Sequence, residues 1–253
     1  MAEILLPQWV IVGAFFTVAL AYASVGLAGG SSYAALMIIF AFSSVVIPNL
    51  SLLLNLIVST AGSFNFIRRG HLNWRLFLPF IVLSLPMAWI GGSLDVPEFV
   101  FKLLLLVSLL IVLLRIYIWR ETALQLDFSR RQAIAISVVC GGIMGLLAGI
   151  TGIGGGIFLV PMILVLGLGT MKQAAACGIV FIWLNSLAGL VSRSQYNFVD
   201  FGDFLPLIIA VMAGGILGSL IGSSRIDSRK LEKVLGLVVA VAALILGRSL
   251  LPN

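Results

Sequence analysis

The residues of this chain best suited to chemistry are two glycine-rich clusters, each interrupting an apolar run and accompanied by hydroxyl side chains. They are Gly29, Gly30, Ser31 and Ser32 in the first cluster, and Gly152, Gly154, Gly155 and Gly156 in the second. Glycine lets a helix stop and restart because it has no Cβ to restrict its backbone. A restarted helix directs free N–H groups and the positive end of its dipole at the break. The clusters therefore predict a binding site for an anion.

Neutral polar side chains in neighbouring apolar runs are further candidates for this site: Asn55, Ser59, Asn185 and Ser186. Amide and hydroxyl donors can bind an oxyanion without the desolvation cost of a buried cation. A structural alternative stays open for each of them. Serine in a membrane helix also bonds the carbonyls of its own helix, and asparagine also links neighbouring helices.

The glycines have a structural alternative as well, because small residues let membrane helices pack closely. That role fits the spaced glycines, which are Gly145, Gly149, Gly214, Gly218 and Gly222. Four of the five residues 152–156 are glycine, which is more than a helix crossing needs, so we expect a functional role for them. A dinucleotide-binding interpretation fails, because it requires a preceding strand in a soluble βαβ unit.

The chemistry that this sequence lacks is equally informative. Its nine carboxylates lie at termini or in predicted loops: Glu3, Asp95, Glu98, Glu121, Asp127, Asp200, Asp203, Asp227 and Glu232. The apolar runs thus carry no acid for a proton relay. One histidine and two cysteines offer no metal cluster or hydrolytic dyad there. We therefore expect no enzyme activity, no catalytic residue, no metal and no cofactor.

The elements that must position these residues are membrane helices. Of the 253 residues, 61% are hydrophobic and 9% charged, and the mean hydropathy is +1.22, which leaves too little polar surface for a soluble protein. A helix needs about 20 apolar residues to cross the bilayer. Runs of this kind occupy residues 8–28, 48–67, 75–94, 98–119, 133–152, 170–192, 203–222 and 232–250. Two shorter runs, 30–46 and 155–169, follow the glycine clusters and are either short crossings or re-entrant segments.

The order of these features occurs twice along the chain. Residues 25–30 align with residues 151–156, and Gly91 aligns with Gly218. The sequence therefore predicts two repeats of about five membrane-embedded helical segments each. The boundaries follow from the one long polar stretch: a first repeat at residues 1–119, a linker at 120–132 and a second repeat at 133–253.

The distribution of basic residues reverses between the two repeats. Lysine and arginine accumulate on the cytoplasmic side of membrane spans, which places the basic loop of residues 68–75 in the cytoplasm. Its counterpart, residues 195–203, is acidic with only Arg193 nearby, whereas the linker is flanked by Arg115 and is cytoplasmic again. An odd number of crossings in each repeat then gives two inverted copies, with both termini outside.

The net charge of +6 does not indicate nucleic-acid binding, because the basic residues gather at the ends of spans, where anionic lipid explains them. We expect a small anion and the lipid bilayer as partners, and no nucleic acid. The expected location is the cytoplasmic (inner) cell membrane, with several crossings. Whether the chain forms a homodimer is left open.

The second glycine cluster and the residues after it resemble the sulfite exporter TauE/SafE family, also grouped with toluene-sulfonate uptake permeases. The resemblance rests on residues 152–156, on Val160-Pro161 and on residues 172–178, and a degenerate copy occurs in the first half. It implies a polytopic transporter of two repeated units that moves sulfite, sulfoacetate, sulfonates or related anions. The first copy departs from the pattern at Ala28, which replaces a glycine.

Together these features predict an all-α integral membrane protein with two inverted repeats and glycine-broken helices. The predicted function is secondary transport of a small anion, namely sulfite, an organosulfonate or a related organic anion, by alternating access around the paired breaks. Two alternatives stay open. A passive anion channel would use the same donors without coupling, and a non-transporting membrane scaffold would need the glycines for packing only.

Overall fold

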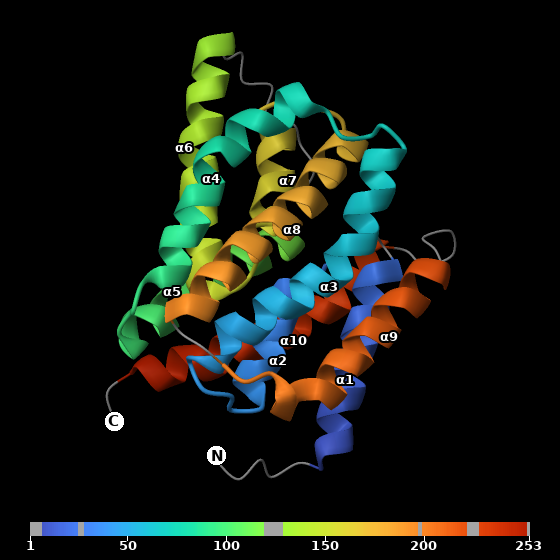
Figure 1. Cartoon of the computed structure of the whole chain (residues 1–253), viewed down its shortest axis with the longest axis vertical. Helices are drawn as coiled ribbons and strands as arrows, with labels where there is room; N and C mark the ends of the chain where they lie inside the picture. The colour runs from blue at the N-terminus through green and yellow to red at the C-terminus, as the bar shows by residue number, and fades with distance from the viewer. Residues whose placement is uncertain (1–6, 25–27, 119–128, 197–198, 222–227, 252–253) are drawn as a thin grey trace.

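The computed structural model describes residues 7–24, 28–118, 129–196, 199–221 and 228–251, and every regular element in these ranges is helical (Figure 1). The elements are α1 (Gln8–Ser24), α2 (Gly30–Ile39), α3 (Val46–Arg68), α4 (Trp74–Ser93), α5 (Glu98–Tyr117), α6 (Arg130–Thr151), α7 (Gly156–Val165), α8 (Met171–Tyr196), η1 (Gly202–Phe204), α9 (Leu205–Ile221) and α10 (Ser228–Leu250). The expectation of an all-α protein is confirmed.

The α-helices of the described ranges correspond in order to the apolar runs predicted from the sequence. Five of them, α3, α4, α5, α6 and α8, are long and apolar enough to cross a membrane by length and composition. The apolar parts of the others are shorter, and α2 and α7 have 10 residues each. The predicted end of α8 near residue 192 was too early: the helix continues to Tyr196 and carries Arg193 in its last turn.

Local sequence signals set the beginnings of two long helices. Ser129 precedes α6 in a capping box, in which its Oγ accepts from the Gln132 N–H at 3.3 Å and Gln132 Oε1 accepts from the Ser129 N–H at 3.0 Å. Asn73 precedes α4, and its side chain accepts from the N–H groups of Arg75 and Leu76. These bonds satisfy donors that the first turn of a helix leaves unpaired.

Two helix pairs, α4 with α6 and α1 with α9, pack closely through glycine. A Cβ at Gly149 of α6 would collide with the Ala88 carbonyl of α4, and one at Gly218 of α9 would collide with the Leu20 carbonyl of α1. The packing role predicted for Gly145, Gly149, Gly214 and Gly218 is confirmed, while Gly222 lies outside the described residues.

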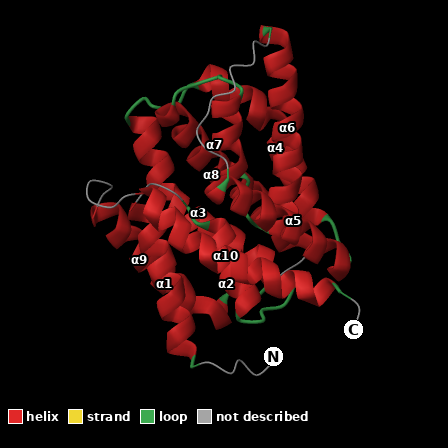
Figure 2. Cartoon of the chain, turned by 180° about the vertical axis from the view of Figure 1, so that it is seen from behind, coloured by secondary structure: helices red, strands yellow, loops and turns green. Residues whose placement is uncertain are grey.

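Helices α3 and α8 pack against each other at the centre of the molecule, and the short helices α2 and α7 lie against them (Figures 1 and 2). Two buried apolar clusters flank this contact, one formed mainly by α1, α2, α3, α5, α9 and α10, the other by α4, α6, α7 and α8. Ile150 and Ile153 beside the second glycine cluster belong to the first of these apolar clusters. The second break therefore lies where the parts of the fold formed by these two apolar clusters meet.

Candidate functional site

Both predicted helix breaks exist, and glycine occupies their left-handed positions. Helix α2 begins after Gly29 (φ 80°), and α7 begins after Gly155 (φ 73°). Gly152 (φ 79°) ends α6, and Gly154 (φ 84°) lies between α6 and α7. Residues with a Cβ rarely adopt these angles, so the glycines permit the interruption. No side chain caps the first turn of α2 or of α7, which leaves the N-terminal end of each helix to the break.

The two breaks lie against each other. A Cβ at Gly30 would lie 2.6 Å from the Ile153 carbonyl oxygen and 2.6 Å from the side-chain oxygen of Asn55. Asn55 of α3 also donates from Nδ2 to the Gly152 carbonyl at 3.0 Å. Because a carbonyl cannot donate, this bond fixes which amide atom is the oxygen. Asn55 therefore links the second break to α3, directly beside the first break.

Two predicted donors of the site are engaged by the protein itself. The Ser59 hydroxyl donates to the backbone carbonyl of Asn55 at 2.6 Å, within its own helix. Asn185 donates to the Phe181 carbonyl at 2.9 Å and accepts from the Ser84 hydroxyl at 2.6 Å, which links α8 to α4. These contacts match the structural alternatives that the sequence left open for serine and asparagine.

Three serines near the breaks differ in their partners. The Ser32 hydroxyl lies 2.9 Å from the Tyr22 hydroxyl, within hydrogen-bond distance, and ties α2 to α1. Ser31 and Ser186 are 2% and 0% exposed, yet within the described part of the chain their hydroxyls have no hydrogen-bond partner. Leaving a buried polar group unpaired costs roughly 1–3 kcal/mol. A ligand that accepted a hydrogen bond from Ser31 would remove that cost.

A cavity of about 40 Å³ lies beside the first break. Gly29, Gly30 and Ser31 line one side of it, and Gly156 with apolar side chains of α7 and α8 lines the other. One water molecule needs roughly 10–15 Å³ of such space, so the cavity has room for a few waters or a small anion. Both glycine clusters thus contribute to one cavity.

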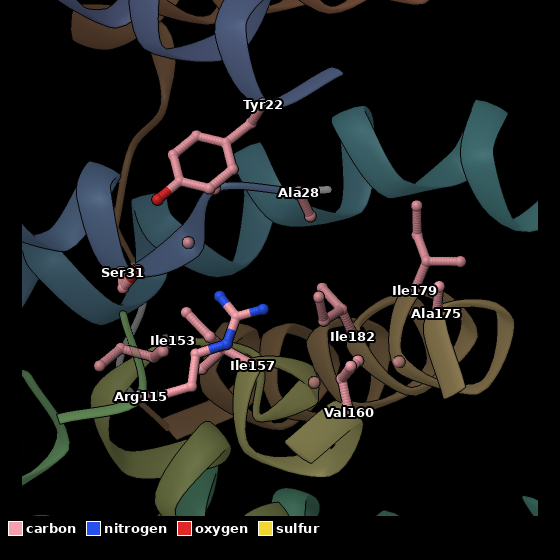
Figure 3. A pocket seen from close by; sticks show the side chains of 14 residues that line it. Tyr22, Ala28, Ser31, Arg115, Ile153, Ile157, Val160, Ala175, Ile179 and Ile182 are labelled. Atoms are coloured by element: carbon pink, nitrogen blue, oxygen red, sulfur yellow. The ribbon is translucent and has the colours of Figure 1, made fainter. Parts of the chain in front are cut away.

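A cationic side chain reaches this cavity. Figure 3 shows the guanidinium of Arg115, from α5, among the lining residues and directed toward Tyr22. Arg115 lies within the run predicted at residues 98–119 and within α5, but its charge was assigned to the cytoplasmic flank of the linker and not to the site. An arginine near the end of an apolar run usually extends to the membrane interface. The sequence signal that could have placed Arg115 inside the apolar helix is the apolar Ile116 that follows it.

The predicted site residues divide into those that line the cavity and those that do not. Gly29, Gly30, Ser31 and Gly156 line it. Ser32, Asn55, Ser59, Gly152, Gly154, Gly155, Asn185 and Ser186 do not. Arg115 and Tyr22 line it and were not predicted.

A second arginine is buried at the end of α6. Arg193 of α8 is 5% exposed, and it donates from Nε to the Gly149 carbonyl at 3.1 Å and from Nη2 to the Ile150 carbonyl at 2.8 Å. Carbonyls in the last turn of a helix have no N–H partner in that helix, and a cation there complements the negative end of the dipole. Arg193 lies one residue beyond the run predicted at 170–192, and its side chain stabilises the helix end before the second break.

Comparison with known proteins decides the family. The family model described as Sulfite exporter TauE/SafE matches residues 11–246. The chain belongs to the sulfite exporter TauE/SafE family. A relative from Sinorhizobium fredii named probable membrane transporter protein y4hK is 38% identical to it over 237 residues, which is 91% of this chain and 94% of the relative. No solved structure matches this TauE/SafE chain.

More distant relatives of this TauE/SafE member carry the same description. A probable membrane transporter protein of Methanocaldococcus jannaschii is 27% identical over 259 residues, which is 95% of each chain. One of Xylella fastidiosa is 25% identical over 238 residues, which is 88% of this chain and 89% of the relative. The chain is therefore a multi-pass membrane transporter and not an enzyme, as the sequence predicted. Among the described residues, no group of three or more His, Cys, Asp or Glu could hold a metal ion.

Proposed function

We propose that this transporter carries a small oxyanion, such as sulfite or an organosulfonate, through the cavity between the two breaks. The observation that carries the proposal is the Arg115 guanidinium pointing into a cavity that both glycine clusters line. A guanidinium binds oxyanions through several N–H donors at once. The buried Ser31 hydroxyl and the N-terminal end of α2 add a neutral donor and a positive dipole end.

The position of this cation beside the two breaks supports a substrate pathway rather than a lipid contact. Ionisable residues within membrane segments are costly, and they usually face a cavity or another polar group and mark the route of a substrate or ion. Arg115 is only partly exposed and lines the cavity together with Gly30 and Ile153, at the contact between the breaks. An anion held there would sit between the two halves of the chain.

Alternating access around inverted repeats is the proposed mechanism. Each half has a 10-residue helix after a left-handed glycine. Helices α1 and α4 of the first half correspond to α6 and α9 of the second, so the close pairs α4–α6 and α1–α9 are equivalent contacts. Helix α3 corresponds to α8, and these two pack against each other. Paired broken helices around a central site are typical of such transporters. The part formed by α1, α2, α3, α5, α9 and α10 would then rock against the part formed by α4, α6, α7 and α8 in the inner membrane, with both termini outside.

Uptake into proteoliposomes tests the role of Arg115. Arg115→Gln removes the charge and keeps hydrogen-bonding capacity, and we expect it to reduce uptake of sulfite or an alkanesulfonate about 10- to 100-fold, the value of a charged hydrogen bond. Arg248→Gln is the matched control, because Arg248 is exposed at the end of α10. Equal uptake by wild type and both variants would refute the anion site.

The same experiment separates the alternatives. Uptake that is unaffected by any counter-ion gradient would indicate a passive channel, whereas dependence on one indicates secondary transport. Folded protein that moves none of the tested anions would indicate a scaffold. Gly155→Leu is expected to abolish uptake while membrane insertion persists, because Gly155 has a left-handed backbone and its Cβ would lie 2.9 Å from the Phe181 ring.

A further inference from the structure

A second, larger cavity lies beside the anion cavity, bordered by α5, α6 and α7 and open on one side. Its volume is about 260 Å³. Its wall is apolar except for Arg115: Ile111 comes from α5, Leu147 from α6, and Pro161 and Met162 from α7. This space, called the side chamber below, is several times larger than the anion cavity and has no second polar side chain in its wall.

The side chamber adjoins the anion cavity and extends to the outer surface of the helix bundle. Arg115 and Ile157 line both spaces, so the guanidinium lies at their junction. At the other end Ile111 is 36% exposed and Ile143 is 56% exposed. In a membrane, apolar side chains on that surface contact lipid hydrocarbon. The side chamber therefore leads from a cationic site toward the apolar interior of the bilayer.

The packing of α5 explains why this space exists. Helix α10 lies along the short helix α2, whereas α5, which has the equivalent place in the first half, touches α7 at few positions and packs mainly on α10. Part of α7 and the facing part of α6 are consequently left without a covering helix. The chamber is thus built into the arrangement of three helices and does not depend on one side chain.

We propose that the side chamber receives the hydrocarbon chain of the transported anion while Arg115 holds the charged head. The ligand class is a single-chain anionic amphiphile, such as an n-alkanesulfonate, rather than a bare inorganic anion. The inference rests on the proposed function, because it uses the same guanidinium. Arg115 supplies the charge complementarity: it is the polar side chain of the chamber and lies at the end where the anion cavity begins.

The chemistry of the wall favours a chain over a polar extension of the substrate. A polar group placed between Ile111, Leu147 and Met162 would lose its water without gaining a hydrogen bond, which is unfavourable. A methylene group placed there gains about fourfold in affinity for its transfer out of water. Affinity should therefore rise with chain length for as long as the chain stays within the chamber.

The test is the chain-length dependence of binding. Methane-, butane- and hexanesulfonate are titrated into the protein in nanodiscs of zwitterionic lipid, with empty nanodiscs as the blank for partitioning. For wild type we expect the ratio of the methanesulfonate Kd to the hexanesulfonate Kd to be at least about 50. Leu147→Trp and Met162→Trp fill the chamber, so this ratio should fall below about 5. Leu103 of α5 is 42% exposed and lies outside the chamber, so Leu103→Trp should keep the wild-type ratio.

Each remaining result overturns the inference in a distinguishable way. Methanesulfonate binding that requires Arg115 but shows no dependence on chain length would refute the side chamber and leave the proposed anion site standing. Equal chain-length gains in the filled variants would assign the gain to lipid. Displacement of hexanesulfonate by 1-hexanol at equal concentration would make the chamber a site for neutral or lipid chains. If no sulfonate binds to the wild type, and uptake by Arg115→Gln equals that of the wild type, the proposed function is refuted as well.

Discussion

At the scale of single residues, the second helix break depends on two side chains that bind backbone carbonyls. Arg193 binds the Gly149 and Ile150 carbonyls, and Asn55 binds the Gly152 carbonyl. A broken helix exposes carbonyls that a continuing helix would bond. In a membrane the cost of leaving them unpaired is higher, since hydrocarbon offers no donor in place of water. The cost of leaving carbonyls unpaired at the end of α6 is therefore offset by the Arg193 and Asn55 side chains.

We expect Asn55→Ala to destabilise the protein by about 1–3 kcal/mol, because the buried Gly152 carbonyl loses its donor. Unfolding in detergent micelles measures the change. Ser194→Ala is the control, since that hydroxyl is exposed and bonds only a carbonyl of its own helix, and it should alter stability by less than about 0.5 kcal/mol. Similar stabilities for the two variants would show that Asn55 does not hold the break.

Arg193→Met should cost about 2–3 kcal/mol, because it keeps an apolar stem but leaves two carbonyls of α6 without a donor. Arg193→Lys should recover less than half of this loss, since one ammonium cannot reproduce the fork of the guanidinium. The same unfolding assay, with exposed Arg248→Met as the control, measures both. A variant Arg193→Met as stable as the control would contradict the capping role.

The sequence predicted the cavity residues whose signal is local. Gly29, Gly30 and Gly156 were found because clustered glycine marks a break wherever it occurs, and Ser31 was found because it follows one. Arg115 was missed because its role depends on which helices surround α5. An arginine at the end of an apolar run looks the same in the sequence whether it extends to the interface or faces a cavity.

At the scale of the elements, hydropathy predicted the helices in their order, because a span must be apolar over most of its length. It did not predict the partners. Gly145 and Gly149 indicate that some helix approaches α6 closely, but not that this helix is α4, since small residues carry no information about what packs on them. The end of α8 was misplaced by one turn because Arg193 resembles a loop residue when its carbonyl partners are unknown.

Gly149→Val tests the contact between α4 and α6. Its Cβ would collide with the Ala88 carbonyl, a backbone atom that cannot move without displacing α4, and we expect a loss of about 3 kcal/mol or failure to accumulate in the membrane. Gly13→Ala in α1 is the contrasting variant, because its Cβ would meet nothing within 4 Å. That variant should be unchanged or up to about 1 kcal/mol more stable. Loss of accumulation in both would refute a specific contact.

At the scale of the whole molecule, the start of α1 and the end of α10 lie at the opposite end of the fold from the basic connection between α3 and α4. In Figure 1 α1 begins and α10 ends at the lower end, whereas the connection from α3 to α4 and the start of α6 lie at the upper end. This arrangement supports the proposed topology, with the basic connection in the cytoplasm. The sequence could propose it because charge bias is read from loops without knowledge of packing.

Reporter fusions test this topology. Alkaline phosphatase fused after Asn253 should be active, because it folds only outside the inner membrane, and green fluorescent protein at the same place should be dark. A reporter pair inserted in residues 69–73, between α3 and α4, should give the opposite result. Activity of the same reporter at both positions would refute the inverted arrangement.

The shortness of α2 and α7 has a consequence for how the protein is made. Each has 10 residues, which is about 15 Å of helix, half of the roughly 30 Å of hydrocarbon that a span must cross. The translocation machinery cannot recognise such a segment as a span by itself. Each of these short helices has to enter the bilayer together with the helix before it, α1 for α2 and α6 for α7. We therefore expect biogenesis to proceed by the release of helix hairpins, with each glycine break as the bend on which its hairpin closes.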